Sequence, residues 1–283
     1  MRVTDLDYPM EKRLIAKLDL MIDRCTGKRK FDNLLIIDGD EGYGKTNMAK
    51  AVAYYIAHTT GRPFNLNHMF FDVDAMINFA QTTQDQVIVW DESALEGLAS
   101  EWQNKTQKKL IKLLMVARKK RHVWIFNIPK YFKLNEYLVA DRCIGLIHVY
   151  ARHEKQLGRF TYYKKKNLQS MYYQWKRKRA RGYKRWSSFH GTFPDMTDKI
   201  YLEEDYDKLK DKAILSVTES PKKSVEETKL LYLKYKISQL KKTNKSELMR
   251  ELGIERTNLV KWNKIPLKHP EILEMKGLVT DYR

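Results

Sequence analysis

The stretch that most constrains this chain is a glycine-rich turn between a short apolar run and a helical pattern. The apolar run covers residues 34–37, and the turn that follows has the spacing G-x-x-x-x-G-K-T. Glycine lets the backbone fold back so that several N–H groups point to one place, and the next helix adds the positive end of its dipole. Such a turn binds phosphate. The residues expected around the phosphates are Gly39, Asp40, Glu41, Gly42, Tyr43, Gly44, Lys45, Thr46 and Asn47.

The last residues of this turn carry the chemistry of a nucleotide site. Lys45 would reach the β- and γ-phosphates, and the Thr46 hydroxyl would ligate Mg²⁺. A glycine-rich connection without a ligand would leave this lysine–threonine pair unexplained. We therefore expect ATP and Mg²⁺ as cofactors.

A second apolar run, residues 86–90, ends in two adjacent carboxylates, Asp91 and Glu92. In a phosphate-loop ATPase, Asp91 would hold Mg²⁺ through water opposite Thr46, and Glu92 would polarise the attacking water as a general base. The alternative is a pair of acids on an exposed turn.

A third apolar run, residues 122–126, ends in Asn127, just before Ile128 and Pro129. If this strand lies between the first strand and the acidic strand, Asn127 lies beside the phosphate loop and orients water or senses the γ-phosphate. The alternative is an asparagine chosen for the turn before proline.

Strand patterns alternate with helical patterns along the first part of the chain, which predicts an α/β fold with a mostly parallel sheet flanked by helices. A helix beginning near residue 74 would take Asp74 as its cap. The expected strands are 34–39, 68–73, 86–91, 122–127 and 144–150, and the expected helices are 8–24, 47–58, 74–80, 104–121 and 134–141.

Two arginines are candidates to reach the γ-phosphate of a neighbouring subunit. Arg118 lies in the basic end of a helix, where positive charge also complements the helix dipole. Arg142 lies between a short helix and a strand, where a salt bridge to Asp141 or another nearby acid is the alternative.

The chain is strongly basic, with 54 Lys and Arg against 35 Asp and Glu and a net charge of +19. This excess predicts a polyanionic partner, most often nucleic acid and sometimes an anionic membrane surface, and DNA is the partner that we expect. The charge is densest between residues 152 and 185, where aromatic residues are interleaved. Either this stretch grips nucleic acid, or its aromatics are core and its charges a solvated face. The candidate DNA contacts are Lys164, Lys165, Lys166, Lys176, Arg177 and Arg179.

The C-terminal part reads as a separate helical unit, with a boundary between residues 216 and 220. We therefore expect a P-loop domain at 1–215, including a basic and aromatic extension at 151–215, and a small all-α domain at 216–283. Residues 244–262 follow a helix-turn-helix pattern, with Arg256, Asn258 and Lys261 on the exposed face of its second helix. A helical bundle that binds only protein is the alternative.

No apolar run is long enough to span a membrane, and the N-terminus lacks the apolar segment of a signal peptide. The 2 cysteines are far apart and lack metal-ligand spacing. We expect a cytoplasmic protein without membrane insertion.

The phosphate loop, the acidic strand, the helix ending at Arg118 and the strand ending at Asn127 together resemble additional-strand P-loop ATPases. Within that group, residues 34–150 look most like the FtsK/HerA-type ATPases of viruses and mobile elements, although that family often has glutamine where this chain has Asn127. The resemblance implies a ring-shaped homo-oligomer, a hexamer, with ATP bound between subunits. It also implies a DNA motor that packages or translocates a genome, with capsid or replication proteins as candidate partners.

Three other functions fit parts of the same pattern. A replication helicase or helicase loader would use the same site on a forked substrate. A DNA-binding or partition protein would use the nucleotide as a switch, although an intact Glu92 favours hydrolysis. A basic structural nucleoprotein with a vestigial loop would retain these residues only by chance.

Overall fold

The computed structural model describes residues 8–27, 31–91, 100–151, 158–180 and 182–219. The chain divides into two units, Met1–Val217 and Thr218–Arg283, and the second enters the described residues only at 218 and 219. The expected helix-turn-helix, with Arg256, Asn258 and Lys261, lies outside the described residues, and so does Glu92.

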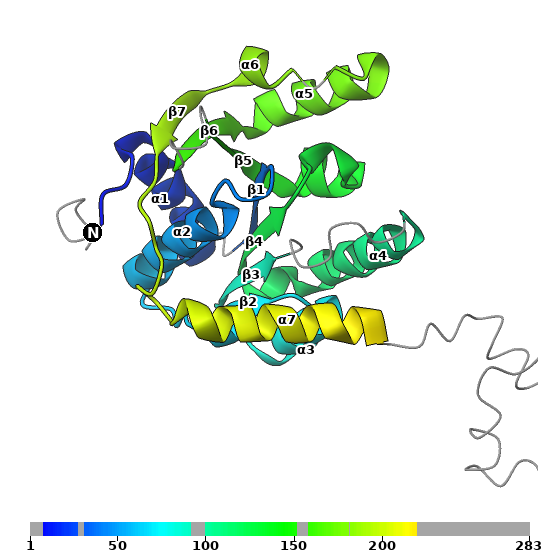
Figure 1. Ribbon diagram of the computed structural model, residues 1–283. Helices are drawn as coiled ribbons and strands as arrows, with labels where there is room; N and C mark the ends of the chain where they lie inside the picture. Colours follow the sequence, from blue (N-terminus) through cyan, green and yellow to red (C-terminus); the bar gives the residue numbers. More distant parts are fainter. Residues whose placement is uncertain (1–7, 28–30, 92–99, 152–157, 181, 220–283) are drawn as a thin grey trace, which may run out of the picture. The chain divides into compact units, whose positions relative to one another are not determined.

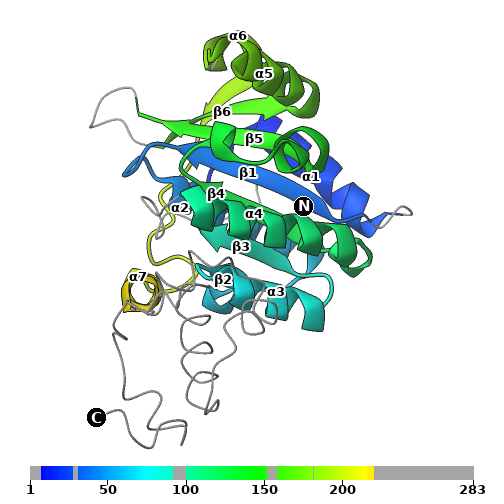
Figure 2. The same cartoon turned by 90° about the vertical axis from the view of Figure 1, so that its right-hand side faces the viewer.

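Seven strands of the described residues form one sheet, in the order β2-β3-β4-β1-β5-β6-β7. Figure 2 shows β2 to β6 side by side. Strands β1 to β5 run parallel, whereas β6 and β7 are antiparallel additions at the β5 edge. The strands are β1 (Asn33–Gly39), β2 (Met69–Phe70), β3 (Val87–Asp91), β4 (Val123–Ile128), β5 (Cys143–Tyr150), β6 (Arg159–Lys164) and β7 (Phe189–Thr192).

This sheet confirms the expected mostly parallel α/β fold. β4 lies between β1 and β3, which is the order that the interpretation of Asn127 required. Because parallel strands end at the same edge, the polar residues that follow β1, β3 and β4 are brought together there.

Helices cover both faces of the sheet (Figure 1). Helices α1 and α2 lie on one face, and α3, α4 and α5 lie on the other. The longer helices are α1 (Lys12–Thr26), α2 (Lys45–Thr60), α3 (Val73–Thr82), α4 (Ser100–Val116), α5 (Lys165–Lys178) and α7 (Glu203–Glu219). Short helical turns are η2 (Leu66–His68), η4 (Ala117–Lys120), η5 (Tyr131–Lys133), η6 (Tyr137–Arg142) and α6 (Tyr183–Trp186).

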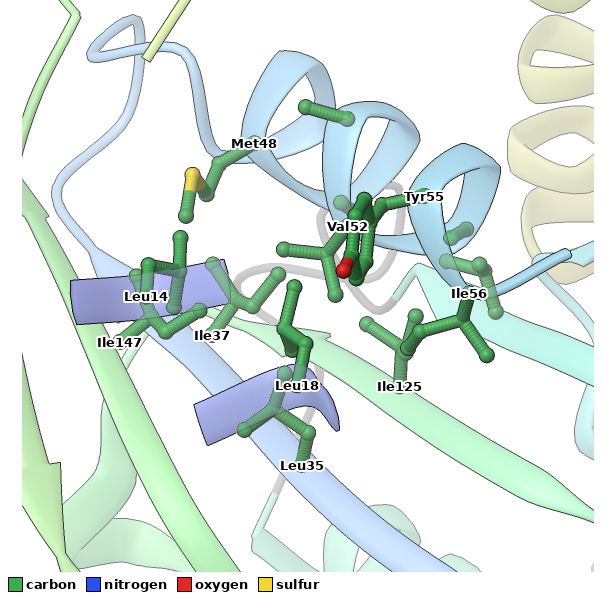
Figure 3. Close-up of a cluster of buried hydrophobic side chains, with 14 of the residues drawn as sticks. Leu14, Leu18, Leu35, Ile37, Met48, Val52, Tyr55, Ile56, Ile125 and Ile147 are labelled. Atoms are coloured by element: carbon green, nitrogen blue, oxygen red, sulfur yellow. The ribbon is translucent and has the colours of Figure 1, made fainter. Parts of the chain in front are cut away.

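The core on the first face joins α1, α2 and the central strands (Figure 3). Leu14 and Leu18 of α1 and Val52 of α2 meet over Leu35 and Ile37 of β1, and all five side chains are buried. The Tyr8 hydroxyl also donates to the Ala51 carbonyl of α2 at 2.7 Å. Helix α1 therefore packs on its own domain.

Local details differ from the sequence predictions at two places. Asp72, and not Asp74, caps α3, because the Asp72 carboxylate accepts from the Ala75 N–H at 2.7 Å. Within the short helix expected at 134–141, the π-helical turn η6 begins only at Tyr137, and the 3₁₀ turn η5 ends before this range at Lys133. No described helix has both the length and the apolar character needed to cross a membrane.

The basic and aromatic extension is part of the domain and not a separate surface. Its first half forms β6 and α5, and the aromatic side chains of Phe160, Tyr162, Tyr163 and Tyr172 are buried. Those four aromatics are therefore core, as the alternative interpretation held. Most lysines and arginines of α5 are exposed instead, whereas Lys165 is half-buried.

A strap, residues 193–202, connects β7 to α7 and passes along the outside of α2 (Figure 1). Helix α7 runs from Glu203 to Glu219, across most of the boundary expected between residues 216 and 220. The strap and α7 bring this late segment to the carboxyl edge of the sheet.

Candidate nucleotide-binding site

The phosphate loop joins β1 to α2, and two of its glycines are required by its shape. Gly39 has φ +148°, and a Cβ there would lie 2.2 Å from the Val149 carbonyl oxygen of β5. Gly44 precedes α2 with φ +89°, in the left-handed region that favours glycine. The Lys45 side chain is buried, and its ammonium donates to the Asp40 carbonyl at 3.0 Å. The loop is therefore folded as the sequence predicted.

Three polar side chains meet where β3 and β4 end beside α2. The Thr46 hydroxyl donates to Asp91 Oδ2 at 3.0 Å, and the Asn127 amide donates to the same oxygen at 2.9 Å. Asp91 and Asn127 are opposite each other in the β3–β4 register, so both side chains lie on the α2 face. The structure thus brings Thr46, Asp91 and Asn127 together, with Lys45 next to Thr46 in the chain.

The donor set fits Mg²⁺. Hydroxyl and carboxylate oxygens are the ligands that Mg²⁺ prefers, and Thr46 and Asp91 supply one of each. Asn127 Oδ1 is buried and has no hydrogen-bond partner among the described residues, so a polar group is missing beside it. Asp91 is itself fully buried, and a buried carboxylate needs hydrogen bonds or a cation.

A fourth residue at this place, Tyr206 of α7, was not predicted from the sequence. Its hydroxyl donates to Asp91 Oδ2 at 2.8 Å and lies 3.4 Å from the Thr46 hydroxyl. Burial, and then the negative charge of Asp91, raise the pKa of Tyr206 well above its usual range. The phenol therefore stays protonated and acts as a donor.

The strap and the start of α7 hold Tyr206 at the site through contacts with α2. Asn47 donates to the Asp195 carboxylate at 2.9 Å, and the Lys50 ammonium forms an ion pair with Glu203. Lys50 is fully buried, and its ammonium lies 4.6 Å from the ring centre of Tyr201. Helix α2 thus connects the phosphate loop to the start of α7.

A pocket of about 660 Å³ opens between the phosphate loop and α7, within the size range of small-molecule sites. Its lining residues are Glu41, Gly42, Gly44, Lys45, Thr46, Asn47, Thr197, Glu203, Tyr206, Asp207 and Lys210. One wall is therefore the expected phosphate loop, and the other is a helix that the sequence analysis left out of the site.

On the opposite face of the sheet, Asp38 connects the start of the phosphate loop to the extension. The Tyr183 hydroxyl donates to Asp38 Oδ2 at 2.6 Å, and His148 Nδ1 lies 2.8 Å from Oδ1. The Tyr131 N–H adds a third contact at 3.2 Å. Asp38 is fully buried, so these partners stabilise its carboxylate.

The two arginines expected to reach the γ-phosphate of a neighbouring subunit lie at the amino-terminal edge of the sheet, because Arg118 precedes β4 and Arg142 precedes β5. The Arg142 guanidinium forms an ion pair with the buried Asp32, as the salt-bridge alternative held. Arg118 is exposed, and its guanidinium lies 4.6 Å from the ring centre of Phe31. Neither side chain lies at its own phosphate loop.

The candidate DNA contacts lie on or beside α5, and most of them are exposed. Lys165 donates to the Asp141 carbonyl, and Lys176 pairs with Glu136, so these two are engaged within the domain. The Arg179 guanidinium lies 5.1 Å from the ring centre of Trp175. The exposed residues among these candidates are Lys164, Lys166, Lys176, Arg177 and Arg179.

A parallel sheet with β4 between β1 and β3, a phosphate loop after β1 and a buried aspartate after β3 define the class of P-loop NTPases. Residues 22–174 match the model of the family Novel STAND NTPase 3. This match covers more than half of the chain, and the chain belongs to that family. The FtsK/HerA resemblance is thus supported only at the level of the P-loop NTPase, and Tyr206 lies beyond the matched residues.

Among solved structures, the chain is similar to one described as replication initiator DnaA bound to AMPPCP and single-stranded DNA. The identity is 12%, the TM-score is 0.32, and the likeness covers 98% of this chain and 93% of that one. A likeness of this size carries no argument about what this chain binds. A comparison with curated proteins finds no match.

Proposed function

We propose that this NTPase binds ATP with Mg²⁺, hydrolyses it, and couples hydrolysis to movement on DNA. The observation that supports the first part is the meeting of Lys45, Thr46, Asp91 and Asn127 at one end of the sheet. A lysine for phosphates, a hydroxyl and carboxylate for the metal, and an amide for water or the γ-phosphate are the parts that phosphoryl transfer needs.

Each residue has a distinct role in this proposal. Lys45 leaves the Asp40 carbonyl and binds the β- and γ-phosphates, while the loop N–H groups hold the remaining oxygens. Thr46 and Asp91 hold Mg²⁺, which would neutralise phosphate charge when bound. Glu92 acts as the general base, and Asn127 of β4 senses the γ-phosphate.

The DNA part of the proposal is supported by charge. Lys166 and Arg177 are eleven positions apart on α5, which brings them to the same side of the helix at about 3.6 residues per turn. Tyr173 lies between them and is 43% exposed, so a ring is available beside two cations. Cations for phosphates and a ring for a base suit a nucleic-acid strand.

The motor is proposed as a homo-oligomeric ring, a hexamer, in which an arginine from a neighbour completes each site. Arg118 is the better candidate for that arginine, because it is exposed whereas Arg142 pairs with Asp32. Packaging or translocation of viral or mobile-element DNA is the activity that we place first, and a replication helicase or loader is its nearest alternative.

Tyr206 favours a second candidate function, a DNA-binding protein switched by its nucleotide. A hydroxyl that contacts both Thr46 and Asp91 ties the state of the site to α7. In that case nucleotide binding, and not continuous turnover, would carry the signal.

Steady-state ATP hydrolysis, measured alone and with duplex or single-stranded DNA, tests these functions. Asp91→Asn and Glu92→Gln serve as inactive controls. Stimulation by duplex that both controls lose supports a translocase, and stimulation by single strands alone supports the helicase or loader. ATP binding without turnover under any condition would leave the switch.

A further inference from the structure

We propose that Tyr206 competes with Mg²⁺ for Thr46 and Asp91, so that binding of a metal–nucleotide complex must displace Tyr206 and move the start of α7. The proposal rests on the nucleotide-binding function proposed above and adds a regulation of that same site. Its basis is the set of hydrogen bonds around one oxygen atom, Asp91 Oδ2.

Asp91 Oδ2 already accepts three hydrogen bonds within the described residues. The donors are Thr46 at 3.0 Å, Asn127 at 2.9 Å and Tyr206 at 2.8 Å. A carboxylate oxygen has about two lone pairs, so three donors saturate it. A metal ion or a metal-bound water at Oδ2 needs one of those lone pairs, and therefore at least one donor must leave.

Tyr206 is the donor that can leave without dismantling the site. Thr46 is fixed by α2, and Asn127 is fixed by β4, which pairs with strands on both sides. Tyr206 belongs to α7, the wall of the pocket that faces the phosphate loop. Its displacement requires a shift of α7 and the loss of the contact between the buried Tyr206 ring and the Phe71 ring, and it leaves the sheet intact.

A movement of Tyr206 would also move the rest of α7. It runs from Glu203 to Glu219 and so continues directly into the residues of the second unit. A shift at Tyr206 would thereby move the helix that leads into that unit.

The test compares Tyr206→Phe with Tyr201→Phe. Both substitutions remove one buried hydroxyl and keep the ring, and the two rings are stacked with centroids 6.0 Å apart. Only the Tyr206 hydroxyl contacts Asp91, because the Tyr201 hydroxyl has no hydrogen-bond partner among the described residues. Tyr201→Phe is therefore a matched control, and thermal melting checks that both variants fold.

The readout is the Kd of the non-hydrolysable analogue AMPPNP, measured by calorimetry with Mg²⁺ and again in excess EDTA. Loss of a charge-assisted hydrogen bond predicts binding about tenfold tighter for Tyr206→Phe in Mg²⁺. In EDTA the affinity should match that of the unmodified protein. Tyr201→Phe should match it under both conditions.

Other outcomes separate this proposal from the one on which it rests. Equal or weaker Mg²⁺-dependent binding by Tyr206→Phe would overturn the competition and make Tyr206 a residue that positions Asp91, with the nucleotide function intact. If neither the unmodified protein nor the variant binds the analogue, the nucleotide function itself fails, and the competition fails with it.

Discussion

At the scale of single residues, His122 shows how burial fixes a protonation state. Its ring is fully buried, with Nε2 3.0 Å from the Ala80 carbonyl and Nδ1 3.2 Å from the Gln86 N–H. A neutral ring satisfies both partners, since Nε2 donates and Nδ1 accepts. Burial, opposed in part by the hydrogen bond to Ala80, lowers the pKa of His122 below its usual value.

This lowered pKa predicts a pH dependence of stability. Because the unfolded chain binds the proton more tightly, the stabilising contribution is complete above the unfolded pKa of about 6.5 and is lost as the pH falls below it. Between about pH 7.5 and pH 5.5, His122→Gln should flatten the fall in unfolding free energy by up to about 1.4 kcal/mol per pH unit. Urea unfolding measures this slope, and the exposed His58→Gln should leave it unchanged.

Much of the candidate site could be predicted because its residues carry local signals. Lys45, Thr46, Asp91 and Asn127 each follow a strand pattern, and parallel strands end at one edge. Tyr206 could not be predicted, because its contact with Asp91 spans 115 residues and begins in a helix dominated by charge. No local pattern encodes such a contact.

At the scale of helices and strands, α1 illustrates how the spacing of apolar residues decides where a helix packs. Leu18 is 1% exposed against α2 and β1, whereas Leu20 on the same helix is 57% exposed. Leu18→Ala should lower the unfolding free energy by about 2–5 kcal/mol, because it leaves a cavity in the core. Leu20→Ala should change it by less than about 0.5 kcal/mol. Similar losses in urea unfolding for both variants would contradict this packing of α1.

The ion pair between α2 and the start of α7 predicts that substitutions of the neighbouring residues Glu203 and Glu204 change the free energy of unfolding by different amounts. Lys50 is fully buried, whereas the side chain of its partner Glu203 is 35% exposed. Glu203→Gln would leave the ammonium without its counter-charge and should destabilise the protein by about 1–3 kcal/mol, allowing for solvent at the carboxylate. Glu204→Gln breaks only an exposed pair with Lys208 and should be nearly neutral. An equal effect in urea unfolding would mean that the start of α7 is not held by this pair.

The edge strands mark the limit of sequence prediction at this scale. Strands β1, β3, β4 and β5 were predictable because continuous apolar runs indicate strands buried on both faces. Residues 159–164 have aromatic residues between two basic ends, and they lie in a stretch for which a nucleic-acid surface and a core with a solvated face were both open interpretations. Burial of Phe160 and Tyr162 supports the second interpretation for these two side chains.

At the scale of the whole molecule, a net charge of +19 attracts any polyanion. A test of the proposed DNA surface on α5 must therefore distinguish specific contacts with DNA from attraction by the net charge. Charge on α5 and charge on α1 contribute alike to the long-range field. They differ at contact, since the exposed stripe of α5 combines Lys166 and Arg177 with Tyr173, whereas Lys12 and Lys17 of α1 are exposed away from α5.

Two double substitutions test this distinction, and each of them removes two positive charges. Lys166→Ala with Arg177→Ala should weaken DNA binding and lower the slope of log K against log salt by about 1–2, because two phosphate contacts are lost. Lys12→Ala with Lys17→Ala should change binding little and leave that slope intact. Fluorescence anisotropy with labelled duplex and single-stranded DNA at several salt concentrations measures both quantities. Equal losses for the two pairs would mean that DNA is held by net charge alone, and α5 would then be no more than a solvated face of this NTPase.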